Sequence, residues 1–258
     1  MKLSKTIIIT IGQRKGGVGK STTTLNLAHV LAEQGYKVLV IDLDDQQNTT
    51  RSISAMVKSE SNIEDLLLKE DISLTSVAVE TSWPDVWILP SSSNLSGVVK
   101  QLDQELGSHL ILKERLENDF FDFILIDTSP SLNILVVNAL CASNYILIPL
   151  SSKFFSMQGL TQTLQAVKKV KTRLNKELKL LGIAFVNHDK RNVLANEVVD
   201  QIRDKYTDQV FKTMIGINIR IEEAQVKKES ILTYAPQDRG SSQYREFGLE
   251  VLNRVLTN

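Results

Sequence analysis

Residues 15–22 read Lys-Gly-Gly-Val-Gly-Lys-Ser-Thr and lie between two segments of different periodicity. The preceding run, Thr6–Ile11, is short and rich in β-branched residues, which is typical of a buried strand. The following run, Ser21–Gln34, has apolar residues at helical spacing and is followed by Gly35, a common helix terminator. A glycine-rich loop between a strand and a helix allows backbone N–H groups to surround phosphate groups.

The polar residues of this loop have expected roles at a nucleoside triphosphate with Mg²⁺. Lys20 reaches the β- and γ-phosphates, the Ser21 hydroxyl coordinates Mg²⁺, and Thr22 lies at the α-phosphate. The alternative is a glycine-rich turn without a ligand. Arg14 occupies the first glycine position of the ordinary G-x-x-x-x-G-K-[ST] pattern, and Lys15 adds a second cation. The expected nucleotide-binding residues of the loop are Lys15, Gly16, Gly17, Val18, Gly19, Lys20, Ser21 and Thr22.

Short aliphatic runs alternate with helical patterns along the rest of the chain. This alternation predicts an α/β fold with a doubly wound, mostly parallel sheet and helices on both faces. The other expected strands are Val38–Ile41, Trp87–Leu89, Phe123–Ile126, Tyr145–Ile148 and Leu180–Val186. The other expected helices are Ser156–Leu178, Val193–Tyr206 and a last helix from about Ser242 to Leu256. Since glycine and proline are scarce and scattered, we expect a single domain over residues 1–258.

The composition excludes several classes of protein. With 42% hydrophobic and 23% charged residues, the 258-residue chain is neither disordered nor fibrous. No apolar run approaches the length of about 18 residues that a membrane span needs. Cys141 is the only cysteine, which excludes an internal disulfide and favours an intracellular protein. The net charge is zero, but residues 1–166 carry 13 basic and 18 acidic side chains, whereas residues 167–258 carry 17 and 12.

Carboxylates follow two of the predicted strands. Asp42 and Asp44 come at the end of the second strand, and Asp127 follows Phe123–Ile126. The carboxyl ends of parallel strands lie at the sheet edge where ligands bind in this kind of fold, beside the glycine-rich loop. Each aspartate taken alone is also explained as a helix cap or turn residue.

The glycine-rich stretch resembles the deviant Walker A loop of the ParA/MinD superfamily of ATPases. The stretch after the second strand, DLDDQQN, resembles the D-x-D-P-Q-x-N motif of ParA proteins. Further similarity to small ParA/Soj partition proteins extends over Leu135–Leu140, Ile146–Leu150, Phe154–Leu160, Leu181–Arg191, Thr213–Ala224 and Tyr234–Tyr244. The chain departs from the family pattern where Asp45 replaces a proline, Lys153 a glutamate and Ile217 an arginine.

The resemblance implies roles for the residues at matching positions. Lys15 is expected to cross the interface of an ATP-bound homodimer and contact the partner's ATP, and Asp44 to orient the attacking water. The implied catalytic residues are Lys15, Lys20 and Asp44. Ser21, Asp42 and Asp127 are expected at the metal, and Asn187 is a candidate for contact with adenine. Asp45 adds a charge beside Asp44, so a slow ATPase is expected, with a non-enzymatic ATP switch as an alternative.

The function implied by the resemblance is ATP-dependent DNA partition, with ATP and Mg²⁺ as cofactors. Such a protein dimerises on Mg-ATP and binds duplex DNA without sequence preference. It is released when a ParB-like centromere-binding protein stimulates hydrolysis, and it is cytoplasmic and nucleoid-associated. The candidate DNA-binding residues are Arg191, Arg220, Lys168 and Lys171, although a basic run on a helix is also typical of a solvated face.

The superfamily also suggests alternatives. A MinD-like membrane-associated regulator needs a basic amphipathic C-terminal helix, but Glu246 and Glu250 offset the basic residues of the tail, so no membrane partner is expected. A nitrogenase-type iron protein needs two cluster-ligating cysteines in each subunit, and the chain has one cysteine. Only 14 residues precede Lys15, so we expect no helix-turn-helix domain of the kind found in repressor-type ParA proteins.

Overall fold

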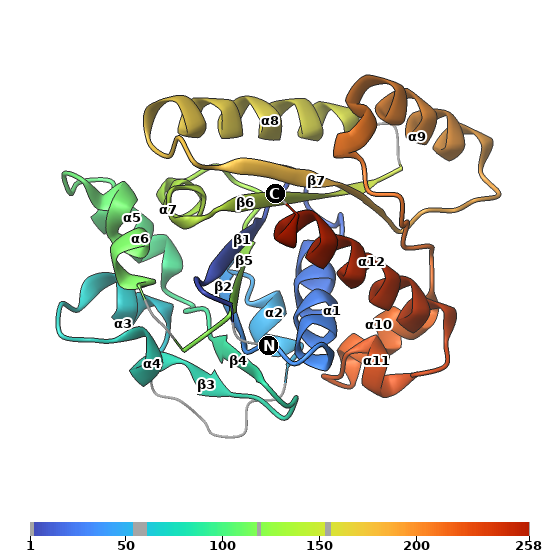
Figure 1. Cartoon of the computed structure of the whole chain (residues 1–258). Coiled ribbons are helices and arrows are strands. Elements are labelled where there is room, and N and C mark those ends of the chain that lie inside the picture. Colours follow the sequence, from blue (N-terminus) through green and yellow to red (C-terminus); the bar gives the residue numbers. More distant parts are fainter. Residues whose placement is uncertain (1–2, 54–60, 118–119, 153–155, 258) are drawn as a thin grey trace.

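The computed structural model describes residues 3–53, 61–117, 120–152 and 156–257. The strands of this described part form one seven-stranded sheet in the order β3-β4-β2-β5-β1-β6-β7 (Figure 1). Neighbouring strands are parallel except for β3, which runs antiparallel to β4 at the edge. The strands are β1 (Ile7–Ile11), β2 (Val38–Leu43), β3 (Val79–Glu80), β4 (Val86–Leu89), β5 (Phe123–Thr128), β6 (Tyr145–Ser151) and β7 (Lys179–Val186).

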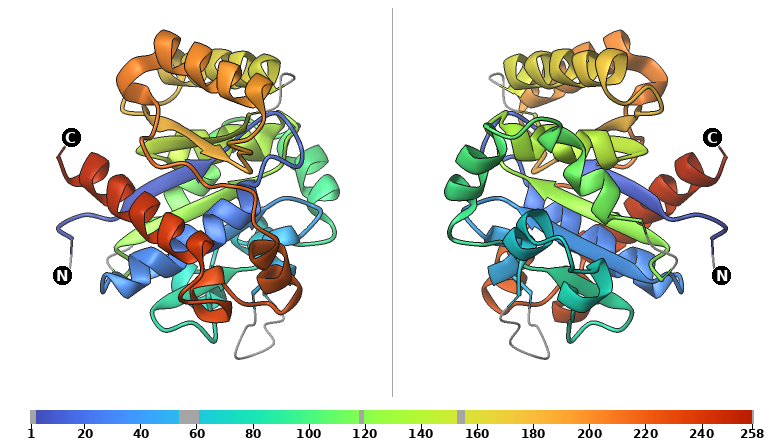
Figure 2. Two further views of the ribbon diagram at one scale, coloured as in Figure 1. Left: turned by 90° about the vertical axis from the view of Figure 1, so that its right-hand side faces the viewer. Right: turned by 90° about the vertical axis from the view of Figure 1, so that its left-hand side faces the viewer.

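Helices cover both faces of the sheet (Figures 1 and 2). The helices of the first part are α1 (Lys20–Glu33), α2 (Asn48–Arg51), α3 (Ile63–Leu68), α4 (Leu74–Val77), α5 (Leu95–Leu102), α6 (Ile111–Arg115) and α7 (Ile134–Ala142). Those of the second part are α8 (Ser156–Arg173), α9 (Val193–Tyr206), α10 (Ile219–Val226), α11 (Ile231–Tyr234) and α12 (Arg239–Leu256). Side chains of α1, α10, α11 and α12 pack on one face, and those of α3 to α9 pack on the other.

Alternating side chains of each strand build a core on both faces. In β2, Val38 and Val40 join the cluster under α1 and α12, whereas Leu39 and Ile41 join the cluster under α3, α5 and α7. All four side chains are fully buried. Because both faces of the sheet are covered, its strands are continuous aliphatic runs rather than alternating ones. The predicted doubly wound α/β fold is confirmed.

One predicted helix boundary is wrong. The helix expected over Ser156–Leu178 ends at Arg173, and Leu174, expected on its apolar side, is 38% exposed. The buried Asn175 side chain explains the early end, because its Nδ2 donates to three backbone carbonyls around the end of α7. The chain therefore turns at Asn175 and enters β7.

The last helix, expected from about Ser242, begins three residues earlier at Arg239 and packs along α1. A Cβ added at Gly248 would collide with the side chain of Val30, so the glycine permits the two helices to approach closely. Phe247 and Val251 are fully buried in this contact.

Among the described residues, no helix has the length and apolarity needed to cross a lipid bilayer.

Candidate nucleotide-binding site

The loop between β1 and α1 has the backbone conformation that its glycines permit. Gly17 and Gly19 have φ angles of +69° and +80°, a region that favours glycine. A Cβ added at Gly16 or Gly17 would meet no described heavy atom within 4 Å, so this side of the loop borders open space. The loop therefore leaves room for a phosphate group beside its backbone and the start of α1.

The start of the loop is fixed to α8. Gln13 is almost fully buried, and its Oε1 accepts hydrogen bonds from Thr163 Oγ1 and from Arg14 N, both at 2.7 Å. A Cβ at Gly159 would lie 3.2 Å from Gln13 Oε1 and 3.3 Å from Cβ of Lys15, so the glycine allows α8 to pass close to the loop. Lys15 is thereby placed against the first turns of α8.

Lys20 is the buried cation of the site, with 7% of its surface exposed. Burial lowers the pKa of its ammonium group, and the nearby carboxylates of Asp127 and Asp44 act in the opposite direction. The structure therefore brings together three predicted residues from α1, the loop after β2 and the end of β5.

Asp127 is fully buried at the carboxyl end of β5. Thr49 Oγ1 donates a 2.6 Å hydrogen bond to its Oδ2, whereas its Oδ1 has no hydrogen-bond partner among the described residues. Burial raises the pKa of Asp127 to about 6, although the hydroxyl groups of Ser21 and Thr49 and the charge of Lys20 oppose the shift. A buried carboxylate oxygen without a partner, close to a serine hydroxyl, suits an oxygen-preferring cation such as Mg²⁺ or its water ligand.

Asp42 lies next to Asp127 in the register of β2 and β5, but protein groups already bind its carboxylate. Oδ2 accepts from Thr50 N at 2.8 Å and Thr50 Oγ1 at 2.7 Å, and Oδ1 accepts from Asp44 N at 3.1 Å. Burial and the charge of Asp127 raise the pKa of Asp42 to about 7. In this arrangement Asp42 shapes the turn that carries Asp44.

Asp44 begins that turn and is 5% exposed. Gln46 N donates to its Oδ1 at 3.1 Å, and Ser91 Oγ donates to its backbone carbonyl at 2.7 Å. Burial raises the pKa of Asp44, whereas the N–H of Gln46 and the charge of Lys20 lower it. Asp45 is exposed and contributes a further upward shift to the pKa of Asp44. The departure at Lys153 lies outside the described residues.

Two further residues lie beside the loop, Asn187 and Gln225. Asn187, at the end of β7, has a left-handed φ of +53°, and its Nδ2 would lie 3.9 Å from a Cβ added at Gly19. Thr22 Oγ1 accepts a 2.7 Å hydrogen bond from Nε2 of Gln225 in α10. The sequence offered no signal for Gln225, because 203 residues separate it from Thr22. Asn187, the predicted candidate for contact with adenine, therefore lies beside the loop.

The predicted arginines lie on two paired segments. Arg191 follows β7, and Arg220 is the second residue of α10. A backbone bridge between His188 and Gly216 joins the two segments. Their side chains are 92% and 54% exposed, and each forms an ion pair with an acidic residue on its own segment. Both guanidinium groups are thus accessible to solvent.

The predicted lysines lie elsewhere. Lys168 and Lys171 are exposed on α8, which packs on the opposite face of the sheet from α10 (Figure 1). The structure therefore does not combine the lysines and Arg220 into one patch within a single subunit.

Known proteins are similar to this chain over most of its length. The family model described as AAA domain matches residues 6–180. Chromosome partitioning protein ParA of Caulobacter vibrioides is 34% identical over 252 residues, which cover 96% of this chain and 94% of the relative. Chromosome-partitioning ATPase Soj of Treponema pallidum is 37% identical over 254 residues, which cover 98% of each protein.

Solved structures share the fold. A crystal structure of a protein described as cobyrinic acid a,c-diamide synthase from Mycobacterium smegmatis, with bound ADP and magnesium, has a TM-score of 0.84 at 28% identity. The match covers 98% of this chain and 96% of the chain in that crystal structure. The ATP complex of a single-residue variant of Cyanothece McdA has a TM-score of 0.85 at 21% identity. The match covers 97% of this chain and 98% of the McdA chain, and it shows similarity of fold alone.

Proposed function

The chain belongs to the ParA/Soj family of chromosome-partitioning ATPases, and on this premise we propose that it is a DNA partition ATPase acting as an ATP-gated homodimer. The observation that carries the proposal is the convergence of Lys20, Asp44 and Asp127 beside the glycine-rich loop. A buried ammonium group between carboxylates, next to open space, fits a triphosphate bound with a divalent cation.

ATP with Mg²⁺ is the ligand that these residues fit. Lys20 and the loop N–H groups balance the phosphate charge, while Ser21 and Asp127 are the residues that would hold Mg²⁺. When bound, Mg²⁺ neutralises charge on the phosphate oxygens. Asp44 accepts a hydrogen bond from the attacking water and thereby orients it, which a buried carboxylate on a fixed turn does well.

Lys15 is proposed to act in the second subunit of the homodimer. It lies at the start of the loop, fixed beside α8 by the contacts of Gln13 and Gly159. A second ammonium group placed at the γ-phosphate of the partner's ATP would stabilise the charge of the transition state, as an arginine finger does. Dimerisation and catalysis are then linked through one residue.

The proposed ligand of the dimer is duplex DNA without sequence preference. Arg191 and Arg220 are exposed at one edge of each subunit, so pairing two subunits doubles the number of phosphate contacts. Each subunit is neutral overall, so attraction to DNA depends on local basic groups, and pairing presents twice as many of them. A ParB-like centromere-binding protein is proposed to stimulate hydrolysis and release the protein from the nucleoid in the cytoplasm.

A MinD-like membrane role is the weaker alternative. It requires a lipid-binding C-terminal helix, whereas most apolar side chains of α12, among them Phe247 and Val251, are buried in the core cluster that α12 shares with α1.

Filter retention of a non-specific DNA duplex tests the proposal, with ATP, ADP or no nucleotide at low and moderate salt. We expect ATP-dependent retention that decreases with salt and is lost in Lys20→Ala, which removes the phosphate-binding ammonium group. Lys100→Ala, at an exposed position on α5, is the matched control and should behave as wild type. Retention that does not depend on ATP, or its absence, would contradict the proposal, and flotation with anionic vesicles tests the membrane alternative.

A further inference from the structure

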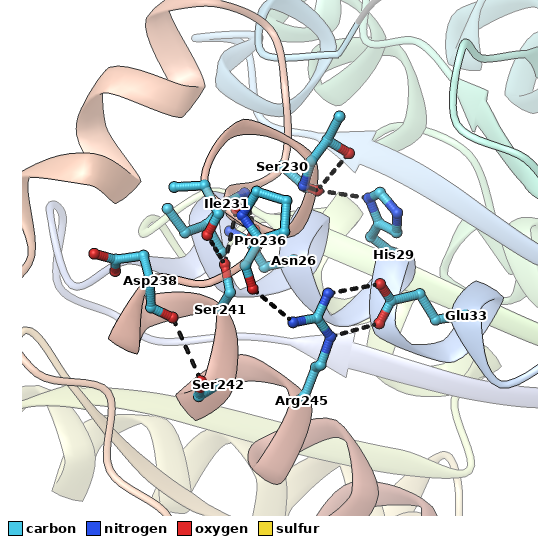
Figure 3. Close-up of polar contacts among 12 residues, drawn as sticks. Asn26, His29, Glu33, Ser230, Ile231, Pro236, Asp238, Ser241, Ser242 and Arg245 are labelled. Carbon is cyan, nitrogen blue, oxygen red and sulfur yellow. Dashed lines mark hydrogen bonds and ion pairs between the residues drawn. The ribbon is translucent and has the colours of Figure 1, made fainter.

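One side of α1 is tied to the C-terminal part of the chain by polar contacts. Four of its residues are spaced by four, three and four positions, which places them on the same side of a helix. Their partners lie within residues 225–245. Figure 3 shows the contacts of Asn26, His29 and Glu33. The contacts join Thr22 to Gln225, Asn26 to Ile231, His29 to Ser230, and Glu33 to Arg245.

The first of these contacts involves the phosphate-binding end of α1. Gln225 Nε2 donates a 2.7 Å hydrogen bond to Oγ1 of Thr22, the third residue of the helix. An amide NH₂ group only donates, so the Thr22 oxygen accepts and its own hydrogen is directed to another acceptor. Gln225 therefore selects one orientation of the Thr22 hydroxyl group.

The helix that carries Gln225 is itself held in place. Asn218 caps the start of α10 by accepting from Arg220 N at 2.9 Å, and Ala224 is buried. Beyond the end of α10, Ile231 N donates to Asn26 Oδ1 at 2.9 Å, one turn of α1 after Thr22. The amide of Gln225 thus approaches Thr22 from a segment anchored on both sides.

We propose that Gln225 is a positioning residue for the nucleotide: it holds the Thr22 hydroxyl group so that the hydroxyl hydrogen faces an α-phosphate oxygen. This inference depends on the proposed function, since it requires a nucleotide on the loop. The α-phosphate is common to ADP and ATP, so both nucleotides gain affinity by the same factor. Loss of one hydrogen bond of this kind lowers the affinity for the nucleotide by about fivefold.

Equilibrium binding of fluorescently labelled ADP and ATP, with Mg²⁺, to the full chain tests this inference. Gln225→Ala should raise Kd about fivefold for both nucleotides. Gln225→Glu should raise it further, because a carboxylate turns the Thr22 hydrogen away from the phosphate and adds negative charge. Gln201→Ala, at an exposed position on α9, is the matched control and should leave Kd unchanged. Thermal unfolding without nucleotide identifies any variant that is misfolded.

A double-mutant cycle separates positioning from a purely structural role. In a Thr22→Val background, Gln225→Ala should cause no further loss of affinity, because its target hydroxyl is absent. Unchanged Kd in both Gln225 variants, an additive loss in the double variant, or an effect on ATP alone would overturn the inference. Wild-type protein that binds no nucleotide would instead overturn the proposed function, and this inference with it.

Discussion

Thr49 Oγ1 lies 2.6 Å from Oδ2 of Asp127 and donates a hydrogen bond to it, although the two residues are 78 positions apart. Thr49 is fully buried on α2, directly after the turn that carries Asp44. The contact uses one oxygen of Asp127 and leaves Oδ1 without a partner among the described residues. The same hydroxyl group therefore orients the carboxylate that we assign to Mg²⁺.

Replacing Thr49 with valine removes that hydroxyl group and keeps the shape of the side chain. The carboxylate of Asp127 then loses its orientation, and groups of this kind typically change metal affinity by about 10-fold or more. We expect the Mg²⁺ concentration needed for half-maximal ATP binding to rise by about 10-fold, as measured in a titration of labelled ATP. Thr172→Val, at an exposed position on α8, is the control. An unchanged Mg²⁺ requirement in Thr49→Val would show that Asp127 does not depend on this contact.

Asp44→Ala should separate ATP binding from hydrolysis. The change removes the group that orients water but leaves Lys20 and the loop, so the ATP-bound dimer should persist while phosphate release falls about 100-fold or more. Phosphate release and size-exclusion chromatography with ATP measure the two effects. Asp45→Asn removes the exposed neighbouring charge that raises the pKa of Asp44, and should hydrolyse ATP at least as fast as wild type. Normal hydrolysis by Asp44→Ala would refute the assigned role.

The two arginines should contribute to DNA binding more than the lysines of α8. Arg191→Ala and Arg220→Ala each remove one cation per subunit, so each should reduce the slope of log affinity against log salt by about 2 in a dimer. Lys168→Ala with Lys171→Ala should have a smaller effect, since α8 lies on the opposite face of the sheet from α10, which carries Arg220. Fluorescence anisotropy with a labelled duplex in ATP, over several salt concentrations, gives the slopes. Equal losses from both pairs would place α8 on the DNA-binding surface.

The sequence predicted the fold well because continuous aliphatic runs mark strands that are buried on both faces, and helical spacing of apolar residues marks the helices that cover them. Local motifs also predicted that Lys20, Asp44 and Asp127 converge, since parallel strands end at one edge. Thr49 and Gln225 could not be predicted in the same way. Each acts through a single hydrogen bond to a residue far away in the sequence, and neither belongs to a periodic pattern. The two-residue strand β3 is too short to show any periodicity.

His29 lies in the middle of the contacts between α1 and the C-terminal helices. Its Nδ1 shares a hydrogen bond with Ser230 Oγ, and its ring packs against Trp83 with 5.2 Å between ring centroids (Figure 3 shows the contact with Ser230). Burial lowers the pKa of His29 below 6.5, Glu33 acts in the opposite direction, and Arg245 lowers it further. The folded protein therefore favours the neutral imidazole.

This shift predicts that His29 by itself makes the fold less stable in mild acid, whereas the raised pKa values of Asp42 and Asp127 act in the opposite direction. Because the pKa of His29 is lower in the folded state, the unfolded chain binds more protons, and the free energy of unfolding decreases as pH falls from above 6.5 towards the folded pKa. His188, whose pKa is lowered by burial and by Lys190, contributes in the same direction. Urea unfolding at several pH values should therefore show that the stability of wild type relative to His29→Gln decreases as the pH falls through this range. A decrease of the same sign is expected for wild type relative to His188→Gln. An unchanged pH dependence in His29→Gln would show that this imidazole does not become protonated on unfolding.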